Sequence, residues 1–108
     1  MTEKTSLGLE ENVEAALCYL VGWVTGLIFL LIENDNKIVK FHAMQSLITF
    51  LPLTVAIWIL GMIPFLGWIF ANFIGILTFI LWIILMIKAF QGEKFKIPVV
   101  GDIAEQNI

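Results

Sequence analysis

The stretch FHAMQSLITFLPLTVAIWILGMIPFLGWIFANFIGILTFILWIILMI, residues 41–87, contains no Asp, Glu, Lys or Arg. A helix rises about 1.5 Å per residue, so roughly 20 residues cross a bilayer core of about 30 Å. The stretch is therefore long enough for two spans. It is divided by GMIPFLG, residues 61–67, because a proline flanked by glycines ends a helix and favours a turn. We predict one helix over residues 36–62 and another over 66–90.

A further apolar segment, at residues 13–32, precedes this stretch. It carries no charge from Ala15 to Ile32 and ends at the polar turn ENDNK, residues 33–37. Because backbone groups in lipid must be hydrogen-bonded internally, apolar segments of this length are predicted to be helical. The N-terminal tail is acidic and lacks the basic region of a secretory signal, which favours a retained span.

The composition supports a membrane protein. Of the 108 residues, 60% are hydrophobic and 14% charged, and the mean hydropathy is +0.98. A soluble chain of this length cannot bury so much apolar side chain. The predicted fold is an all-α integral membrane protein, one domain over residues 1–108, with three transmembrane helices in a small bundle. The second helix is longer than a perpendicular span needs, so we expect an interfacial start and a kink at Pro52.

The charges predict the orientation and exclude one class of partner. The net charge is −3 and the chain has no Arg, so nucleic-acid binding has no support. With three spans, five of the six lysines fall on the side of the first loop and the C-terminal tail. The positive-inside rule then predicts a plasma-membrane protein with a cytoplasmic, interfacial C-terminal tail and an outside N-terminus. An outer aromatic belt would contain Tyr19, Trp58 and Trp68.

One face of the second predicted helix is polar. His42, Gln45, Ser46 and Thr49 fall within one arc when the helix is projected at 100° per residue. Polar side chains at membrane depth belong inside a bundle or along a wet cavity. We predict an interhelical network that joins this face to the first helix, with Glu33 or a backbone carbonyl as the partner of His42. Gating, partner binding and proton transfer are the alternatives.

Small residues recur on the other two helices. Gly22 and Gly26 form a GxxxG pair in the first helix, and the third helix carries Gly67, Ala71 and Gly75. Such residues let helix backbones approach closely. They predict packing within the bundle or contacts between copies of the chain.

The sequence offers no site for catalysis. No serine, histidine and carboxylate arrangement supports hydrolysis, and a single histidine without nearby Cys, Asp or Glu is not a metal site. Cys18 is the only cysteine and cannot form an intramolecular disulfide. We therefore expect no enzymatic activity and no cofactor.

Two segments resemble a known family. CYLVGWVTGLIFLLIENDNKIVKFHAMQSL, residues 18–47, contains a His-Ala-x-Gln element, and the tail contains FQGEKFKIPVVGD, residues 90–102. Over residues 16–104 the chain resembles small prokaryotic membrane proteins related to the Tic-twenty component of the chloroplast inner-envelope protein-import machinery. The resemblance implies a non-enzymatic helical membrane protein, with a role in protein translocation or membrane-protein assembly.

Three functions follow as hypotheses. The first is a helical module in the lipid bilayer that assembles with itself or with other membrane proteins. The second is a pore or carrier for ions or small solutes, which would have to be oligomeric because three helices enclose no useful lumen. The third is a lysis protein, which would carry a strongly charged C-terminal tail, whereas this tail is mixed and near neutral.

Overall fold

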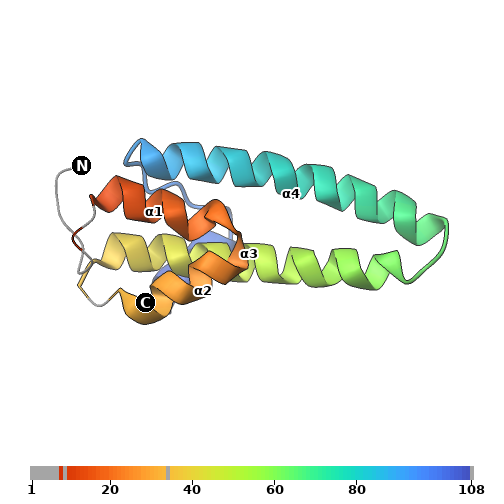
Figure 1. Cartoon of the computed structure of the whole chain (residues 1–108), viewed down its shortest axis with the longest axis horizontal. Helices are drawn as coiled ribbons and strands as arrows, with labels where there is room; N and C mark the ends of the chain where they lie inside the picture. Colours follow the sequence, from red (N-terminus) through yellow and green to blue (C-terminus); the bar gives the residue numbers. More distant parts are fainter. Residues whose placement is uncertain (1–7, 9, 34, 108) are drawn as a thin grey trace.

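The computed structural model describes residues 8, 10–33 and 35–107, which form five helices (Figure 1). The two long helices are α3 (Lys37–Gly61) and α4 (Leu66–Phe90). The three short ones are α1 (Glu11–Leu20), α2 (Trp23–Ile32) and α5 (Val100–Gln106). The prediction of an all-helical fold is confirmed for this part of the chain.

The long helices α3 and α4 form an antiparallel pair joined by the turn at residues 62–65 (Figure 1). Both are long and apolar enough to cross a membrane. Their bounds lie within one residue of the predicted 36–62 and 66–90, and α3 continues through Pro52 as one helix. A Cβ at Gly67 would lie 2.1 Å from the Leu60 carbonyl oxygen. Only glycine therefore lets the two helices close so tightly at the turn.

The first predicted span is broken in the middle. Residues 13–32 do not form one helix, because α1 ends at Leu20 and α2 begins at Trp23. Between them Gly22 adopts φ +63° and ψ −131°, a conformation that residues with a Cβ rarely reach. The chain reverses here and α2 runs back beside α1 (Figure 1). The prediction of three transmembrane helices is thus not confirmed, and α3 and α4 are the two candidate spans.

The two short helices, α1 and α2, make a hairpin of half-membrane length. Each has 10 residues, which corresponds to about 15 Å, half the thickness of a bilayer core. The side-chain nitrogen of Asn36 donates to Glu11 Oε2 at 2.6 Å, so the two open ends of the hairpin lie together. The prediction that the N-terminus lies outside assumed three membrane spans. Because the hairpin takes the place of the first span, that argument no longer holds.

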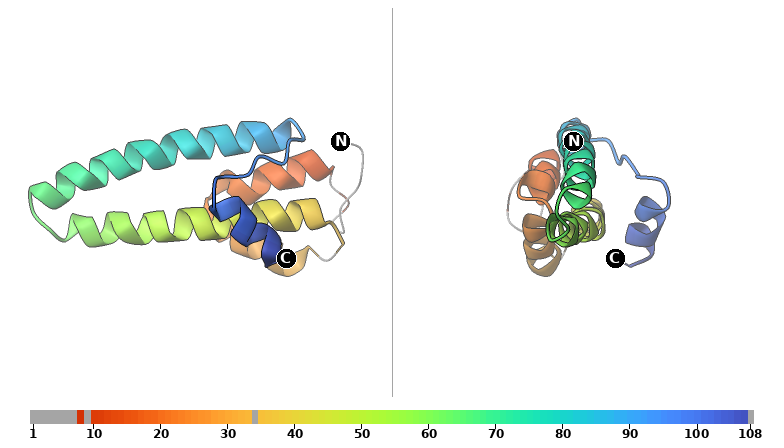
Figure 2. Two further views of the ribbon diagram at one scale, coloured as in Figure 1. Left: turned by 180° about the vertical axis from the view of Figure 1, so that it is seen from behind. Right: turned by 90° about the vertical axis from the view of Figure 1, so that its right-hand side faces the viewer.

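The N-terminal half of α3 lies between two layers. The α1–α2 hairpin covers one side, and the tail with α5 covers the other (Figure 2). The buried side chains of α3 accordingly all fall between Val39 and Phe50. They pack against Ala15, Cys18 and Tyr19 of α1, among others.

The other half of the α3–α4 pair projects beyond these layers as a two-helix rod. The molecule measures 49 × 22 × 22 Å, and only 6% of the most apolar stretch of α4 is buried within the protein. Large apolar side chains such as Trp58 and Phe73 are about two-thirds exposed. Apolar surface on this scale requires a covering, and a bilayer provides it.

The C-terminal tail is held by ion pairs. Lys94 and Lys96 both bind the Glu105 carboxylate, the latter at 2.9 Å, and Lys96 also lies 3.4 Å from Asp102. The two lysines, Lys94 first, hold the pKa of Glu105 at about 2, well below its usual range. The ammonium of Lys94 lies 4.9 Å from the centre of the Phe41 ring. These contacts fix α5 against the N-terminal half of α3.

Candidate functional site

The break between α1 and α2 leaves backbone groups without helical partners, and Thr25 binds two of them. Its hydroxyl accepts a hydrogen bond from the Val21 backbone N–H and donates one to the Cys18 carbonyl, both at 3.1 Å. Within a membrane, irregular backbone is tolerated only where its polar groups are satisfied by the protein. A threonine one turn after the break therefore stabilises the reversal locally.

The long helices satisfy the remaining groups at the apex. Ser46 of α3 donates its hydroxyl hydrogen to the Gly22 carbonyl at 2.8 Å. The indole N–H of Trp82, on α4, donates to the Tyr19 carbonyl at 2.7 Å and more weakly to that of Leu20 at 3.3 Å. The apex is thus bound to both candidate spans, at Ser46 of α3 and Trp82 of α4.

A buried network connects the hairpin, α3 and the tail. The Tyr19 hydroxyl lies 2.8 Å from His42 Nδ1, and Gln45 Nε2 donates to the same hydroxyl at 2.9 Å. Gln45 also binds the tail, since Nε2 donates to the Phe95 carbonyl and Oε1 accepts from the Ile97 N–H, each at 2.9 Å. All three network side chains are at most 2% exposed.

The direction of the hydrogen bonds made by Gln45 follows from its backbone partners in the tail. The Ile97 N–H can only donate, so the Gln45 oxygen must face it and the Gln45 nitrogen must face Tyr19. Because that nitrogen can only donate, the Tyr19 hydroxyl is free to give its own hydrogen to His42 Nδ1. A neutral His42 with its ring proton on Nε2 can accept that hydrogen bond at Nδ1.

The open end of the hairpin has its own polar cluster. Asn36 Oδ1 accepts from the backbone N–H groups of Ile38 and Val39, which caps α3, while its nitrogen reaches Glu11. Glu33 Oε2 accepts from the backbone N–H groups of Asp35 and Asn36, both at 3.0 Å. The cluster fixes the start of α3 beside the start of α1.

The predicted polar residues divide among these contacts. His42, Gln45 and Ser46 all contact the hairpin. Glu33 binds the turn before α3 instead, and the hydrogen-bond partner of His42 is Tyr19. Thr49 is buried, and its hydroxyl has no hydrogen-bond partner within the described part of the chain. Tyr19 was expected in an aromatic belt but is fully buried, because the break turns the end of α1 toward α3.

The predicted small residues have three different roles. A Cβ at Gly26 would lie 2.8 Å from the Ala43 carbonyl, so this glycine and Gly67 allow close helix contact. Gly22 supplies the reversal and does not share a continuous helical face with Gly26. Ala71 is half-buried, and a Cβ at Gly75 would meet nothing within 4 Å.

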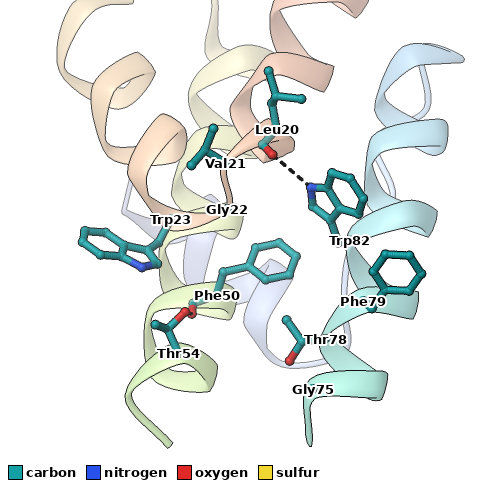
Figure 3. A pocket seen from close by; sticks show the side chains of 10 residues that line it. All are labelled: Leu20, Val21, Gly22, Trp23, Phe50, Thr54, Gly75, Thr78, Phe79 and Trp82. Atoms are coloured by element: carbon teal, nitrogen blue, oxygen red, sulfur yellow. Dashed lines mark hydrogen bonds between the residues drawn. The ribbon is translucent and has the colours of Figure 1, made fainter. Parts of the chain in front are cut away.

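The open space beside Gly75 is part of a cavity of about 370 Å³ beneath the apex (Figure 3). Residues of the hairpin, α3 and α4 line it, among them Val21, Phe50, Phe79 and Trp82. Within residues 8, 10–33 and 35–107, no group of three or more His, Cys, Asp or Glu could hold a metal ion. Most of the residues that line the cavity are apolar.

Comparison with known proteins identifies the family. Residues 10–104 match the magnetosome magnetite crystal formation protein family, MamF/MmsF. The chain belongs to this family. A UPF0132 membrane protein of Methanocaldococcus jannaschii is 56% identical over 95% of this chain and 93% of its own length. The magnetosome protein MmsF of Paramagnetospirillum magneticum is 35% identical over 98% of this chain and 99% of its own. No solved structure matches.

Membership of the MamF/MmsF family corrects the resemblance inferred from the sequence. The family match over residues 10–104 and the two relatives named above show that the Tic-twenty assignment was wrong. The His-Ala-x-Gln element on which it depended has a structural use here. His42, Ala43 and Gln45 are buried against the hairpin and the tail, so the element reports how α3 is packed. The relatives are named membrane proteins, in agreement with the predicted class.

Proposed function

We propose that this protein is a non-enzymatic membrane scaffold that crosses the bilayer twice and acts through its lipid-embedded helix surfaces. The observation that carries the proposal is how its polar groups are used. The polar groups of the buried network and of the apex bind partners within the protein, which leaves a closed core, while only 6% of the most apolar stretch of α4 is buried. Such a molecule offers an extended helix face for assembly, and its described residues form no open polar cleft for catalysis.

The proposed topology differs from that predicted from the sequence. Lys37, Lys40, Lys88, Lys94 and Lys96 all belong to the half of the molecule that contains the open end of the hairpin. The positive-inside rule favours the cytoplasm for that half. We therefore infer that the start of α1 and the C-terminal tail both lie on the cytoplasmic side of the cell membrane, with the 62–65 turn outside. Lys4 falls outside the described residues.

We propose self-association as the mode of action. The family description names magnetite crystal formation, and a relative is named a magnetosome protein. We infer that this chain acts by assembling with other copies of itself in the membrane, through the unburied face of α4. This needs no transported substrate, whereas the pore or carrier alternative does.

The test is the oligomeric state of the protein in lipid nanodiscs, measured by light scattering at several protein-to-lipid ratios. The proposal expects complexes of two or more copies that persist on dilution with lipid. Phe73→Glu, at an exposed position of α4, should convert them to monomers, whereas Trp58→Glu on α3 should not. A native protein that is monomeric at every ratio would contradict the proposal.

A further inference from the structure

The cavity beneath the apex of the α1–α2 hairpin is open toward the membrane. It has a volume of about 370 Å³, within the range of ligand pockets. Two of its lining residues, Phe79 and Leu20, are about half exposed. Figure 3 shows these residues on α4 and at the end of α1, with the cavity between them and Phe50 of α3. The cavity is therefore accessible from the side of the molecule.

The polar hydrogens of Thr54, Thr78 and Trp82 in the lining are already used. The Thr54 hydroxyl donates to the Phe50 carbonyl and the Thr78 hydroxyl to the Ile74 carbonyl, each at 2.7 Å within its own helix. The Trp82 N–H donates to the Tyr19 carbonyl. No charged side chain is among the lining residues. An occupant therefore meets a mainly apolar lining without charge, which favours a hydrocarbon.

The position of the cavity indicates where that hydrocarbon comes from. Thr78 is midway along α4, and Phe50 is next to the midpoint of α3. The hairpin reaches only this depth, so lipid of the opposite leaflet fills the space below it. An empty apolar space would forfeit the dispersion contacts of its walls, whereas a flexible chain end can fill it. The free ends of lipid chains lie at this same depth.

We propose that the cavity binds the terminal segment of a lipid hydrocarbon chain from the leaflet opposite the hairpin. The chain end would lie against Gly75, where the missing side chain opens the wall, and against the faces of Phe50 and Trp82. This goes beyond the scaffold function, because it assigns a specific lipid contact to the hairpin apex. A bound chain end would connect the hairpin to the lipid of the leaflet that it does not enter.

Fluorescence quenching of Trp82 tests this proposal in vesicles of phosphatidylcholine. Trp23, Trp58 and Trp68 are replaced by Phe, so that Trp82 is the only emitter. The vesicles contain lipid brominated either near the chain end or near the headgroup. We expect the chain-end probe to quench Trp82 more strongly. Gly75→Leu should abolish that excess, because the added side chain occupies the cavity, where its Cβ meets nothing within 4 Å.

Gly61→Leu is the matched control. A Cβ at Gly61 also meets nothing within 4 Å, but this residue lies at the end of α3, away from the cavity. The excess quenching should persist in this variant. Equal quenching by both probes in the native protein, or an unchanged excess in Gly75→Leu, would overturn the proposal. Quenching that rises as the protein is diluted with lipid would mean that a second copy fills the cavity, which also overturns it.

A second measurement covers the case in which the Trp-to-Phe background does not fold. Lipid bound to the native sequence after delipidation in detergent is counted by native mass spectrometry, beside Gly75→Leu and Gly61→Leu. The proposal expects loss of retained lipid from Gly75→Leu alone. Equal retention by all three proteins would contradict it.

Discussion

The Asn36 side chain donates a hydrogen bond of 2.6 Å to Glu11 Oε2, so the residue that precedes α3 lies beside the residue that begins α1. The 24 residues between them therefore leave one end of the molecule and return to it. A transmembrane helix cannot do this, whereas two half-length helices joined at a glycine can. The contact between these two side chains thus distinguishes a re-entrant hairpin from the span that hydropathy predicts.

Gly22→Ala should destabilise the protein because of the backbone conformation at the apex. A residue with a Cβ at φ +63° and ψ −131° is strained by about 1–3 kcal/mol. By the behaviour of small domains, each kcal/mol lowers Tm by about 4–8 °C. Thermal unfolding in mild detergent, followed by circular dichroism, measures the change. Gly61→Ala is the control and should not lower Tm, so equal losses in the two variants would rule out a special role for Gly22.

Gly26→Ala and Gly75→Ala should change stability in opposite directions. Alanine gains about 1 kcal/mol over glycine inside a helix. At Gly26 the new Cβ would lie 2.8 Å from the Ala43 carbonyl oxygen, and such overpacking costs about 1–3 kcal/mol. At Gly75 it meets open space. Denaturation of both variants in one detergent gives the comparison. A stabilised Gly26→Ala would mean that α2 does not pack closely on α3.

The sequence predicts the two long helices well because their signals are local. The run without charge, the turn GMIPFLG at residues 61–67 and the polar residues before Lys37 place both ends of α3 and α4 within a residue. The break at Gly22 has no such signal. Residues 13–32 have the length and hydropathy of a span, and glycine is common in membrane helices. The bonds that favour the break come from Ser46 and Trp82, which only the tertiary fold brings to the apex.

The polar contacts of α3 could be predicted in part for the same reason. Helical projection places His42, Gln45 and Ser46 on one face, and all three are buried. Their partners depend on where the preceding segment turns. A continuous first helix would carry Tyr19 into the outer half of the membrane, so Glu33 was the expected partner of His42. The reversal brings Tyr19 against His42 and leaves Glu33 at the turn.

Tyr19→Phe should loosen the junction between the hairpin and α3. It removes the hydroxyl that binds both His42 and Gln45. Hydrogen bonds of this kind within membranes are worth about 0.6 kcal/mol on average and up to about 2. We therefore expect a measurable loss of stability in detergent without global unfolding. The control is Thr49→Val, which removes a buried hydroxyl that has no hydrogen-bond partner among the described residues. If both variants lost equal stability, the network would not be the cause.

Docking of the C-terminal tail should depend on acid pH. The pKa of Glu105 is about 2 in the folded tail, below the value of 4.5 for an unpaired carboxyl. A depressed pKa stabilises the docked tail above pH 4.5, and this stabilisation is lost as the pH falls toward 2. Limited digestion by an acid protease, or amide exchange in α5, follows the release. Glu105→Gln should remove the pH dependence, and Glu93→Gln, which loses only a pair with Lys88, should keep it. A native tail equally protected at pH 5 and pH 2 would contradict this assignment.

The most direct test of the re-entrant hairpin is the sidedness of three single cysteines in sealed membrane vesicles. In a Cys18→Ala background, cysteine replaces Glu10 before α1, Met62 in the turn after α3, or Gln106 in α5, all of which are exposed. An impermeant thiol reagent is added from one side and then, after permeabilisation, from both. The account predicts that Glu10 and Gln106 positions react from the same side and the Met62 position from the opposite one. Reaction of the Glu10 position together with Met62, and opposite to Gln106, would show that residues 13–32 cross the membrane and would contradict it.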